Sequence, residues 1–377
     1  DDSVLYLGPL YYYLQAPFLA ATLFDPIGLA IIIIAARLAT TLLIYLIAKE
    51  IFNRQVAILA AILSALSPYF VSSLGPTSQP YLIPLVVAII IFLLLKKSKV
   101  GLVVSGFLCG LTSHFHYLGL SVLPVLFLYP FFSSNKQKLS ASIAIIVGFL
   151  LAISPQLLFE LRNNFFLSKQ IITQLTSGVV NSQVQSVSGQ FTLAADLLSG
   201  TILGVHLRAF LFILIVAIAT TLAIKNTTPN YKQLSIFLIL VALINFVAIG
   251  FYGSKIQSHY LAVAYVPLFI LTSYLISYTS RFNRLLPVVL ITIIAVALIG
   301  KNDLSRTSGY TMPEDLTLVQ IRQISKIIAS DVSSKTLNIT STLDGDSRAM
   351  PYRYLMDVYG KKPLDVQTYD RGDSLYI

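Results

Sequence analysis

The chain has 377 residues, of which 56% are hydrophobic and only 11% are charged, and its mean hydropathy is +0.80. Soluble domains carry about 25% charged residues, so the composition excludes a soluble globular protein, and it equally excludes a disordered or collagen-like chain. The single cysteine, Cys109, excludes an internal disulfide framework and a zinc site built on cysteines. A polytopic membrane protein is the class that remains.

The net charge of +10 lies entirely in residues 1–300, which hold 16 Lys and Arg but only 6 Asp and Glu, whereas residues 301–377 hold 10 of each kind. Nucleic-acid binding is one explanation of a basic excess. Here the basic residues sit in short connections between apolar segments, as membrane topology requires. We therefore expect no nucleic-acid partner.

Ten apolar stretches approach the length of about 20 residues with which an α-helix crosses a bilayer. They lie at 27–48, 56–74, 80–95, 100–116, 117–133, 140–158, 207–224, 233–253, 260–278 and 285–300. Of the 16 basic residues, 11 fall in alternate connections, at 49–55, 96–99, 134–139, 225–232 and 279–284. The positive-inside rule places these connections in the cytoplasm. The sequence therefore predicts an all-α polytopic membrane fold with about ten transmembrane helices and an external C-terminus.

The segments on the external side differ in character. Residues 3–24 are aromatic-rich and are interrupted by Pro9 and Pro17, which predicts helices lying at the interface. Residues 159–206 are expected to form a long external loop. The tail, 301–377, predicts a small external α/β module after the transmembrane domain of residues 1–300. Its helices are expected over 316–332 and 348–360, and its strands over 336–344 and 363–370.

Candidate functional residues are the polar groups near the external helix ends, because ionisable residues at membrane depth are costly and commonly functional. Arg37 lies inside the first span. The others are His114, His116, Glu160, Arg162, Lys169, His206, Arg208, Lys255 and His259. An anionic ligand would explain the cations through charge-assisted hydrogen bonds to phosphate, and snorkelling to lipid headgroups is the alternative. We find no metal-ligand cluster, and a divalent cation stays open as a cofactor.

Several segments resemble the bacterial GT-C membrane glycosyltransferases, which are related to the dolichyl-phosphate-mannose protein mannosyltransferases and the lipid A aminoarabinose transferase. The similar segments are LGPLYYYLQAPFLA at 7–20, DP at 25–26, Arg37, AKEIFNRQVAILAAILSALSPYFV at 48–71, SPQLLFELRNNF at 154–165, HYLAVAYVPLFIL at 259–271 and YRYLMDVYGKKP at 352–363. Together they span most of the chain, and their order and topology carry the resemblance.

The resemblance implies an inverting enzyme that moves a hexosyl or pentosyl group from a polyprenyl-phosphate donor to a hydroxyl acceptor in a protein, lipid or cell-envelope glycan. Its site would face outward from the bacterial cytoplasmic membrane. The residues expected to bind the donor phosphate are Arg162, Lys255, His259 and Arg37, and those expected to line the groove are Tyr11, Tyr12, Glu160, His114 and His116. The essential acid of the family lies early in the first external loop. Asp2 is the candidate here, and we expect an upstream helix and acidic motif to be missing from the chain.

Two other functions stay open. A transporter or flippase for a lipid-linked anion would have repeats and polar residues near the midplane of the bilayer. Arg37 is the charged residue predicted to lie near that midplane. A catalytically incomplete membrane binding protein is the other alternative.

Overall fold

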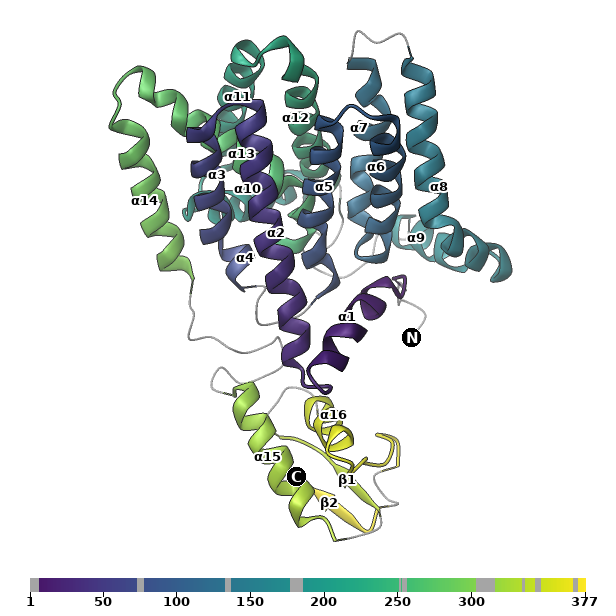
Figure 1. The fold of residues 1–377 in the computed structure, drawn as a ribbon. Helices are drawn as coiled ribbons and strands as arrows, with labels where there is room; N and C mark the ends of the chain where they lie inside the picture. The colour runs from purple at the N-terminus through teal and green to yellow at the C-terminus, as the bar shows by residue number, and fades with distance from the viewer. Residues whose placement is uncertain are drawn as a thin grey trace. The chain divides into compact units, whose positions relative to one another are not determined.

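The computed structural model describes residues 7–72, 78–132, 137–176, 186–250, 252, 256–302, 316–333, 336–342, 347–368 and 372–377 (Figure 1). The chain divides into two compact units. The first, the membrane unit, comprises Asp1–Tyr13, Ile33–Val71 and Ser78–Asn302. The second, the C-terminal unit, comprises Leu14–Ile32, Ser72–Thr77 and Asp303–Ile377. Helices α1 (Leu10–Ala21) and α2 (Ile27–Ile51) each belong partly to both units.

The rest of the membrane unit is helical in every regular element that the structure describes. In chain order the elements are α3 (Arg54–Leu66), α4 (Pro68–Ser72), η1 (Gln79–Leu82), α5 (Ile83–Leu95), α6 (Lys99–Leu111), η2 (Thr112–His114), η3 (Tyr117–Ser121), α7 (Val122–Leu128), η4 (Tyr129–Phe132), α8 (Lys138–Arg162), α9 (Phe166–Thr176), α10 (Val187–Leu203), α11 (Ala209–Asn226), α12 (Pro229–Gly250), η5 (Ser258–Leu261), α13 (Ala262–Tyr278), η6 (Thr279–Arg281) and α14 (Leu286–Lys301). Each of the ten predicted apolar stretches is mainly helical over its described residues.

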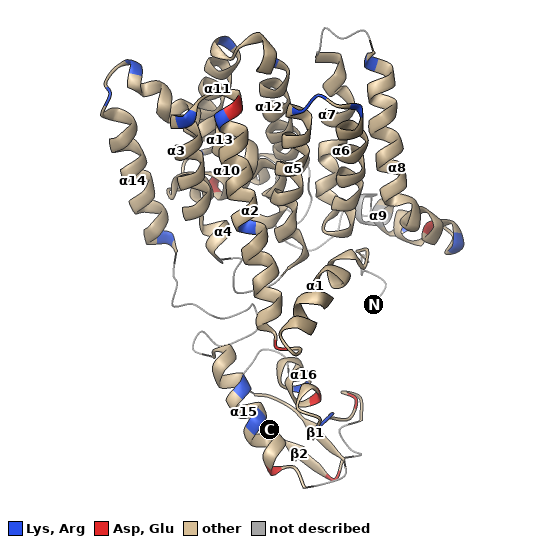
Figure 2. Ribbon diagram, in the orientation of Figure 1, with Lys and Arg blue, Asp and Glu red and all other residues tan. Residues whose placement is uncertain are grey.

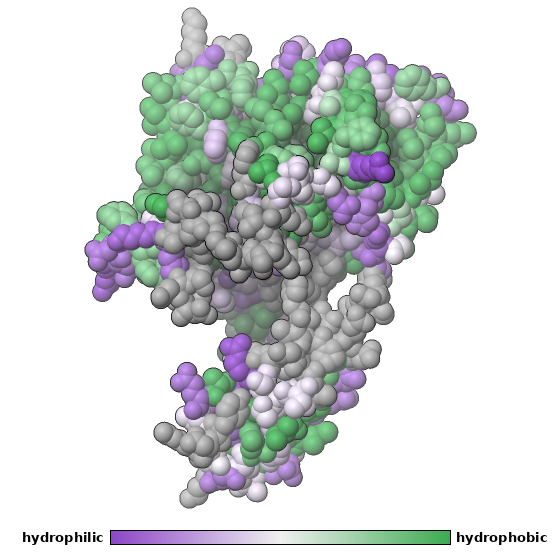
Figure 3. All heavy atoms as spheres, turned by 180° about the vertical axis from the view of Figure 1, so that it is seen from behind, coloured by the Kyte–Doolittle hydropathy of each residue, from purple (hydrophilic) through white to green (hydrophobic). Residues whose placement is uncertain are grey.

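Five helices within the described residues are long and apolar enough to cross a membrane. They are α2, α8, α11, α12 and the segment Ser258–Arg281, and shorter apolar helices lie at Arg54–Leu66, Gln79–Leu95, Tyr117–Phe132 and Leu286–Lys301. Side chains over the membrane unit form a broad hydrophobic belt (Figure 3). Such a belt is favourable where lipid replaces water, and the predicted all-α polytopic membrane fold is confirmed.

Lys and Arg gather at one end of the helices, which we name the basic end (Figure 2). There α2 ends after Lys49, α6 begins at Lys99, α11 ends after Lys225 and η6 carries Arg281. The other end of the same helices, named the opposite end, contains the end of α12 and the starts of η1 and η5. The basic residues thus lie in every second connection between the helices, as the topology predicted from the sequence requires.

Helix α13 is the centre of the unit, because it is buried around almost its whole circumference and packs against α3, α5, α11 and α12. A helix that is hydrophobic on all sides is expected in this position. Helices α6 and α8 approach even more closely. A Cβ atom added at Gly106 would lie 1.9 Å from the carbonyl oxygen of Ile145, and one at Gly148 would lie 1.9 Å from that of Val103. Only glycine permits this backbone contact.

The prediction of a loop over 159–206 is wrong, because this segment contains α9 and α10. A Cβ at Gly250 would lie 2.1 Å from the Phe191 ring, and one at Gly204 would lie 2.6 Å from the Ala297 backbone. Helix α10 therefore crosses the opposite end of the unit from α12 to α14. Its Ser, Gly and Thr residues suggested a loop, but burial of Ala194 and Leu198 stabilises a helix despite weak intrinsic propensity.

The C-terminal unit contains α15 (Leu318–Asp331), β1 (Leu337–Ile339), α16 (Met350–Val358) and β2 (Ser374–Tyr376). The strands pair in parallel with Asn338 opposite Leu375, and α16 forms the crossover between them. The predicted strand at 363–370 is wrong over its described residues. The Leu364 amide still donates to the Leu337 carbonyl at 2.9 Å, but an Asp365 side-chain turn, accepting from the Gln367 amide at 3.0 Å, ends extension there.

Candidate functional site

Arg37 is enclosed by aromatic rings. Its side chain is only 6% exposed, and its guanidinium carbon lies 4.4 Å from the ring centre of Phe70, 4.9 Å from that of Tyr69 and 5.5 Å from that of Tyr81. A guanidinium is attracted to the negative faces of such rings. Because it remains charged at every physiological pH, these residues hold a permanent positive charge inside the fold.

The surroundings of Arg37 place it near the opposite end rather than at mid-depth. Tyr69 lies in the short helix α4, which follows α3, and Tyr81 lies in η1, which precedes α5. Both tyrosines therefore lie at the opposite end of the membrane unit. The Tyr265 ring, near the start of α13, lies 4.5 Å from that of Tyr69. Arg37 is about ten residues inside α2 because the first part of this helix, through Ile32, belongs to the C-terminal unit.

A second group unites His116 and His259, two of the predicted site residues. Their ring centres are 5.7 Å apart, and the Tyr260 ring lies 4.8 Å from His116 and 4.6 Å from His259. The Tyr252 ring lies 5.3 Å from Tyr260. His116 is fixed as the cap of η3, because its Nδ1 accepts from the Leu118 amide at 3.2 Å. The two imidazoles thus lie edge to face, with an angle of 76° between their planes, among tyrosine rings.

Helix η5 joins the two groups. Its first residue, Ser258, accepts a hydrogen bond from the Tyr265 hydroxyl at 2.7 Å, while His259 and Tyr260 belong to the imidazole group. The same turn contacts η1, which carries Tyr81. The Arg37 group and the imidazole group are therefore two parts of one region at the opposite end of the membrane unit.

Helix α1 brings further predicted residues to this end of the unit. Tyr11 is buried, whereas Tyr12 is exposed and its hydroxyl accepts from Gln79 Nε2 at 3.4 Å. His114 is also buried, and Gly8 packs against it so closely that a Cβ would lie 1.8 Å from its Nδ1. Of these residues Tyr12 is the one available to line an open groove.

Glu160 has a different position from the one expected. Its carboxylate accepts from the backbone amides of Leu167 and Ser168, both at 2.8 Å, and from the Ser168 hydroxyl. It therefore caps the first turn of α9, and its role in lining the groove stays a prediction. Arg162 is exposed at the end of α8.

Lys255 and Asp2 lie outside the described residues, so their candidate roles stay predictions. Among the residues that are described, no three His, Cys, Asp or Glu side chains are grouped as a metal site. The aromatic residues Tyr69, Tyr81, Tyr260 and Tyr265 were not named from the sequence. The signal for Tyr69, Tyr81 and Tyr260 was a Pro-Tyr or His-Tyr pair at a helix end, in SPYFV, QPYL and SHYL.

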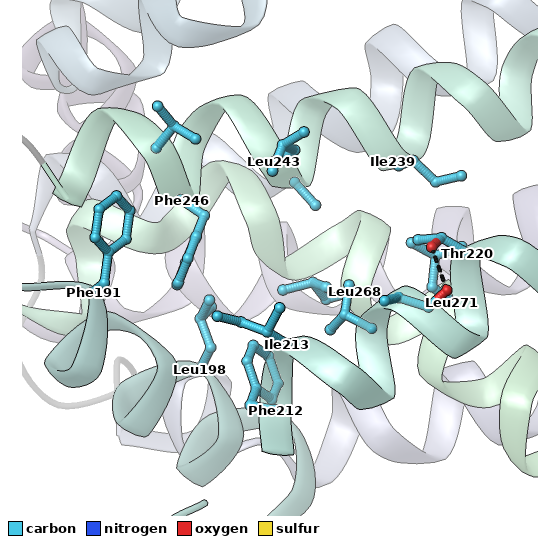
Figure 4. A pocket seen from close by; sticks show the side chains of 14 residues that line it. Phe191, Leu198, Phe212, Ile213, Thr220, Ile239, Leu243, Phe246, Leu268 and Leu271 are labelled. Atoms are coloured by element: carbon cyan, nitrogen blue, oxygen red, sulfur yellow. Dashed lines mark hydrogen bonds between the residues drawn. The ribbon is translucent and has the colours of Figure 1, made fainter. Parts of the chain in front are cut away.

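An apolar groove of about 430 Å³ lies among α10, α11, α12 and α13. Phe191, Phe212 and Phe246 line it toward the ends of α10, α11 and α12 that lie at the opposite end (Figure 4). Its polar lining residue Thr220 donates to the Ala217 carbonyl at 2.8 Å, which satisfies the hydroxyl within its own helix. Next to Phe191, Gln190 donates to the Tyr252 carbonyl at 2.8 Å. The start of α10, which carries the groove residue Phe191, is thus bonded to the residue whose ring lies against Tyr260.

Residues 7–159 match the family described as dolichyl-phosphate-mannose-protein mannosyltransferase. The fold is similar to that of ArnT from Cupriavidus metallidurans bound to undecaprenyl phosphate, with a TM-score of 0.61, 12% identity and coverage of 94% of this chain and 74% of that one. It is also similar to the oligosaccharyltransferase AglB from Archaeoglobus fulgidus in complex with an inhibitory peptide and a dolichol-phosphate. That match has a TM-score of 0.54, 13% identity and coverage of 96% and 57%. No curated protein sequence matches the chain.

The fold thus defines a class, the polytopic membrane proteins built like these two structures. Residues 7–159 thus resemble the mannosyltransferase family, and the fold over most of the chain is similar to those of ArnT and AglB. The resemblance seen in the sequence is thereby confirmed. The missing upstream helix stays a prediction.

Proposed function

We propose that the protein transfers a sugar from a polyprenyl-phosphate donor to a hydroxyl acceptor at the external face of the bacterial cytoplasmic membrane. The observation that carries the proposal is the caged guanidinium of Arg37 at the opposite end, in one region with His116 and His259. The similar structures of ArnT and AglB hold undecaprenyl phosphate and a dolichol-phosphate, respectively. We extend this class of lipid phosphate to the donor of the present protein.

The chemistry of the reaction accounts for this arrangement. When the bond between the sugar and the phosphate breaks, negative charge develops on the departing phosphate. A fixed guanidinium in surroundings that exclude water stabilises that charge strongly and needs no reorganisation. Arg37 and His259 are our principal candidates for this role, with Lys255 and Arg162 as further candidates. An inverting transfer also needs a carboxylate to take the acceptor proton, and Asp2 is the candidate in this chain.

The apolar groove among α10–α13 supports the same donor class. A polyprenyl chain is a long hydrocarbon, and a groove lined by Phe, Leu, Ile and Val gives it close contacts. We propose that the polyprenyl chain lies along this groove. The phosphate at its end would then lie outside the groove, near Gln190 and Tyr252 and toward His259. Tyr12, exposed beside Gln79, would line the groove on the side of the sugar.

Binding of undecaprenyl phosphate to the full-length protein in lipid nanodiscs tests the proposal. We expect Arg37→Gln to weaken binding about tenfold or more, because it removes a charge-assisted contact. Arg54→Gln at the start of α3, at the basic end, is the matched control and should bind normally. His259→Ala provides a second arm if Arg37→Gln does not fold. Unchanged affinity in both folded variants would rule out this phosphate site.

The position of Arg37 bears on the transporter alternative. The transporter hypothesis depends on a charge near the midplane of the bilayer. The rings that enclose Arg37, however, lie at the opposite end of the membrane unit. Counterflow uptake of a labelled polyprenyl-phosphate sugar into proteoliposomes would separate the two functions. A transferase should show no uptake above that of protein-free vesicles, while sustained uptake would favour the transporter.

A further inference from the structure

His259 lies in η5, a single turn of 3₁₀ helix whose own hydrogen bonds hold it only weakly. The turn is four residues long, and within the described part of the chain its N-cap residue, Gln257, supplies no side-chain bond to it. The Tyr260 amide donates to the Gln257 carbonyl at 3.0 Å, and the Ala262 amide donates to the His259 carbonyl. A 3₁₀ turn has poorer hydrogen-bond geometry than an α-helix. The orientation of the His259 ring therefore depends also on contacts from outside the turn.

Two buried side chains from other helices bond the residues on either side of His259. The Tyr265 hydroxyl, from α13, donates to the Ser258 carbonyl at 2.7 Å. Asn245 Nδ2, from α12, donates to the Tyr260 carbonyl at 3.3 Å. Both donor residues are fully enclosed, with 0% exposure. Because the backbone before and after His259 is bonded to two helices of the core, the direction in which its ring projects is fixed as well.

Tyr265 belongs to the surroundings of Arg37 too. Its ring centre lies 4.5 Å from that of Tyr69, and the Tyr69 ring lies 4.9 Å from the Arg37 guanidinium carbon. One side chain therefore contacts the Arg37 group through its ring and the turn of His259 through its hydroxyl. A shift of this turn away from the hydroxyl would change the spacing between the two groups.

We propose that Tyr265 and Asn245 are positioning residues, which orient His259 toward the phosphate of a lipid donor that Arg37 also binds. The inference rests on the proposed function. Neither side chain needs to touch the phosphate, because each acts on the backbone of η5. Groups that are held in place beforehand stabilise charge better than groups that must first move. Losing either donor lets the turn shift, and His259 then meets the phosphate less well.

The energetics of Asn245 favour a role in positioning over a role in stability. Its Oδ1 atom is buried and meets no donor among the residues that the structure describes, and an unpaired amide oxygen in an apolar interior lowers stability. The bond from its Nδ2, at 3.3 Å, is longer than the usual range of about 2.7–3.2 Å. Asn245→Leu removes the unpaired oxygen but leaves the Tyr260 carbonyl without its donor. We therefore expect little change in the thermal midpoint from this variant.

Matched variants separate these contacts from general packing. Tyr265→Phe removes the hydroxyl and keeps the ring against Tyr69. Tyr274→Phe is the control, because Tyr274 lies on the same helix and its hydroxyl donates to the Leu222 carbonyl at 3.3 Å, near the basic end. Thr201→Val removes a further hydrogen-bonding neighbour of the Tyr265 hydroxyl and leaves the hydroxyl itself in place.

Histidine signals in NMR spectra report the position of the His259 ring without depending on activity. The chain has four histidines, so the full-length protein with isotope-labelled histidine gives a simple spectrum in nanodiscs, in which His259→Ala assigns the signal. Nearby aromatic rings shift such signals, and the Tyr260 and His116 rings lie 4.6 Å and 5.7 Å from that of His259. His206, which pairs with Asp196 at 2.9 Å, is the internal reference.

We expect Tyr265→Phe to shift the His116 and His259 signals and to weaken binding of undecaprenyl phosphate about threefold to tenfold. Asn245→Leu should act in the same direction but to a smaller extent, because its bond is the longer one. Tyr265→Phe combined with His259→Ala should bind no more weakly than His259→Ala alone, because the positioning acts through His259. A general loss of packing would instead add to the effect of His259→Ala.

The two remaining variants, Tyr274→Phe and Thr201→Val, should behave like the unaltered protein in both measurements. An effect of Thr201→Val equal to that of Tyr265→Phe would overturn the proposal, since the bond to the turn would then not be the cause. Unchanged histidine signals in Tyr265→Phe, or shifted signals with unchanged affinity, would overturn it as well. So would a further loss of affinity in the double variant.

Failure of the proposed function would be recognised separately. If the unaltered protein does not bind undecaprenyl phosphate, that function is wrong, and the histidine signals then decide whether Tyr265 and Asn245 orient His259. If Tyr265→Phe does not fold, Asn245→Leu decides by the same two measurements. It should shift the signals and lower the affinity, and no change in either would overturn the proposal.

Discussion

The guanidinium carbon of Arg37 lies 4.4 Å from the centre of the Phe70 ring, and this contact links α2 to the short helix that follows α3. Phe70 in turn lies against α13, because its ring centre is 5.6 Å from that of Phe269. The ring therefore connects the proposed phosphate-binding charge to the central helix of the unit. A side chain in this position controls where the guanidinium lies.

We predict that Phe70→Leu weakens binding of undecaprenyl phosphate without abolishing it. Leucine keeps most of the apolar contact with Phe269 but has no ring for the cation, and a buried cation–π contact contributes about 2 kcal/mol. The expected loss is about threefold to thirtyfold in affinity, measured by titration in nanodiscs. Phe92→Leu, in α5, is the control, since the Phe92 ring lies 5.2 Å from Lys96 near the basic end. Equal losses in the two variants would contradict a specific role for Phe70.

Glu160 gives a second prediction, about local structure rather than binding. Glu160→Ala leaves the Leu167 and Ser168 amides without their acceptor, which should cost about 1–2 kcal/mol of local stability. Glu160→Gln keeps one acceptor oxygen, so its loss of local stability should be about half of that caused by Glu160→Ala. Hydrogen exchange of α9 followed by mass spectrometry measures the effect, with α11 as the internal reference. Faster exchange confined to α9 is expected, and unchanged exchange would show that the cap is unimportant.

The sequence was sufficient for the helices of the membrane unit, because apolar length and the alternation of Lys and Arg are strong signals that tertiary packing does not reverse. It was not sufficient for α10, since Gly189, Ser199 and Gly200 favour a loop in isolation. Only burial against α11, α12 and α14 makes that segment helical. The strand predicted at 363–370 failed for a local reason, the side-chain turn at Asp365.

The site was partly predictable. His116 and His259 were both named and do come together, because each lies at a helix end on the same side of the membrane unit. The rings around Arg37 were missed because a Tyr at a helix end is typical of the aromatic belt of any membrane protein. The sequence of α2 alone also does not reveal which rings of α4 and η1 surround Arg37.

The C-terminal unit depends on one buried arginine. Arg353 Nη1 donates to the Leu364 carbonyl at 2.5 Å, Nη2 donates to the Ile339 carbonyl at 2.7 Å, and Nη2 also bonds the Asn338 side chain. We predict that Arg353→Met leaves these acceptors without a donor and lowers the free energy of unfolding of the unit by about 2–4 kcal/mol. Limited proteolysis of the full-length protein should then cleave within 316–377 much faster. Lys362→Met, at an exposed position, should leave the rate unchanged, and equal rates for both variants would contradict the prediction.

The contact between α6 and α8 allows the sharpest test of the membrane fold. Gly148→Val would place side-chain atoms against the Val103 carbonyl, where even a Cβ lies only 1.9 Å away, so the helices must separate. Overpacking of this kind costs about 1–3 kcal/mol or more. Gly300→Ala is the matched control, because a Cβ there meets nothing within 4 Å and alanine favours the helix. Thermal unfolding in detergent should show a lowered midpoint for Gly148→Val and an equal or raised one for Gly300→Ala. An unchanged midpoint for Gly148→Val would mean that α6 and α8 do not pack backbone against backbone.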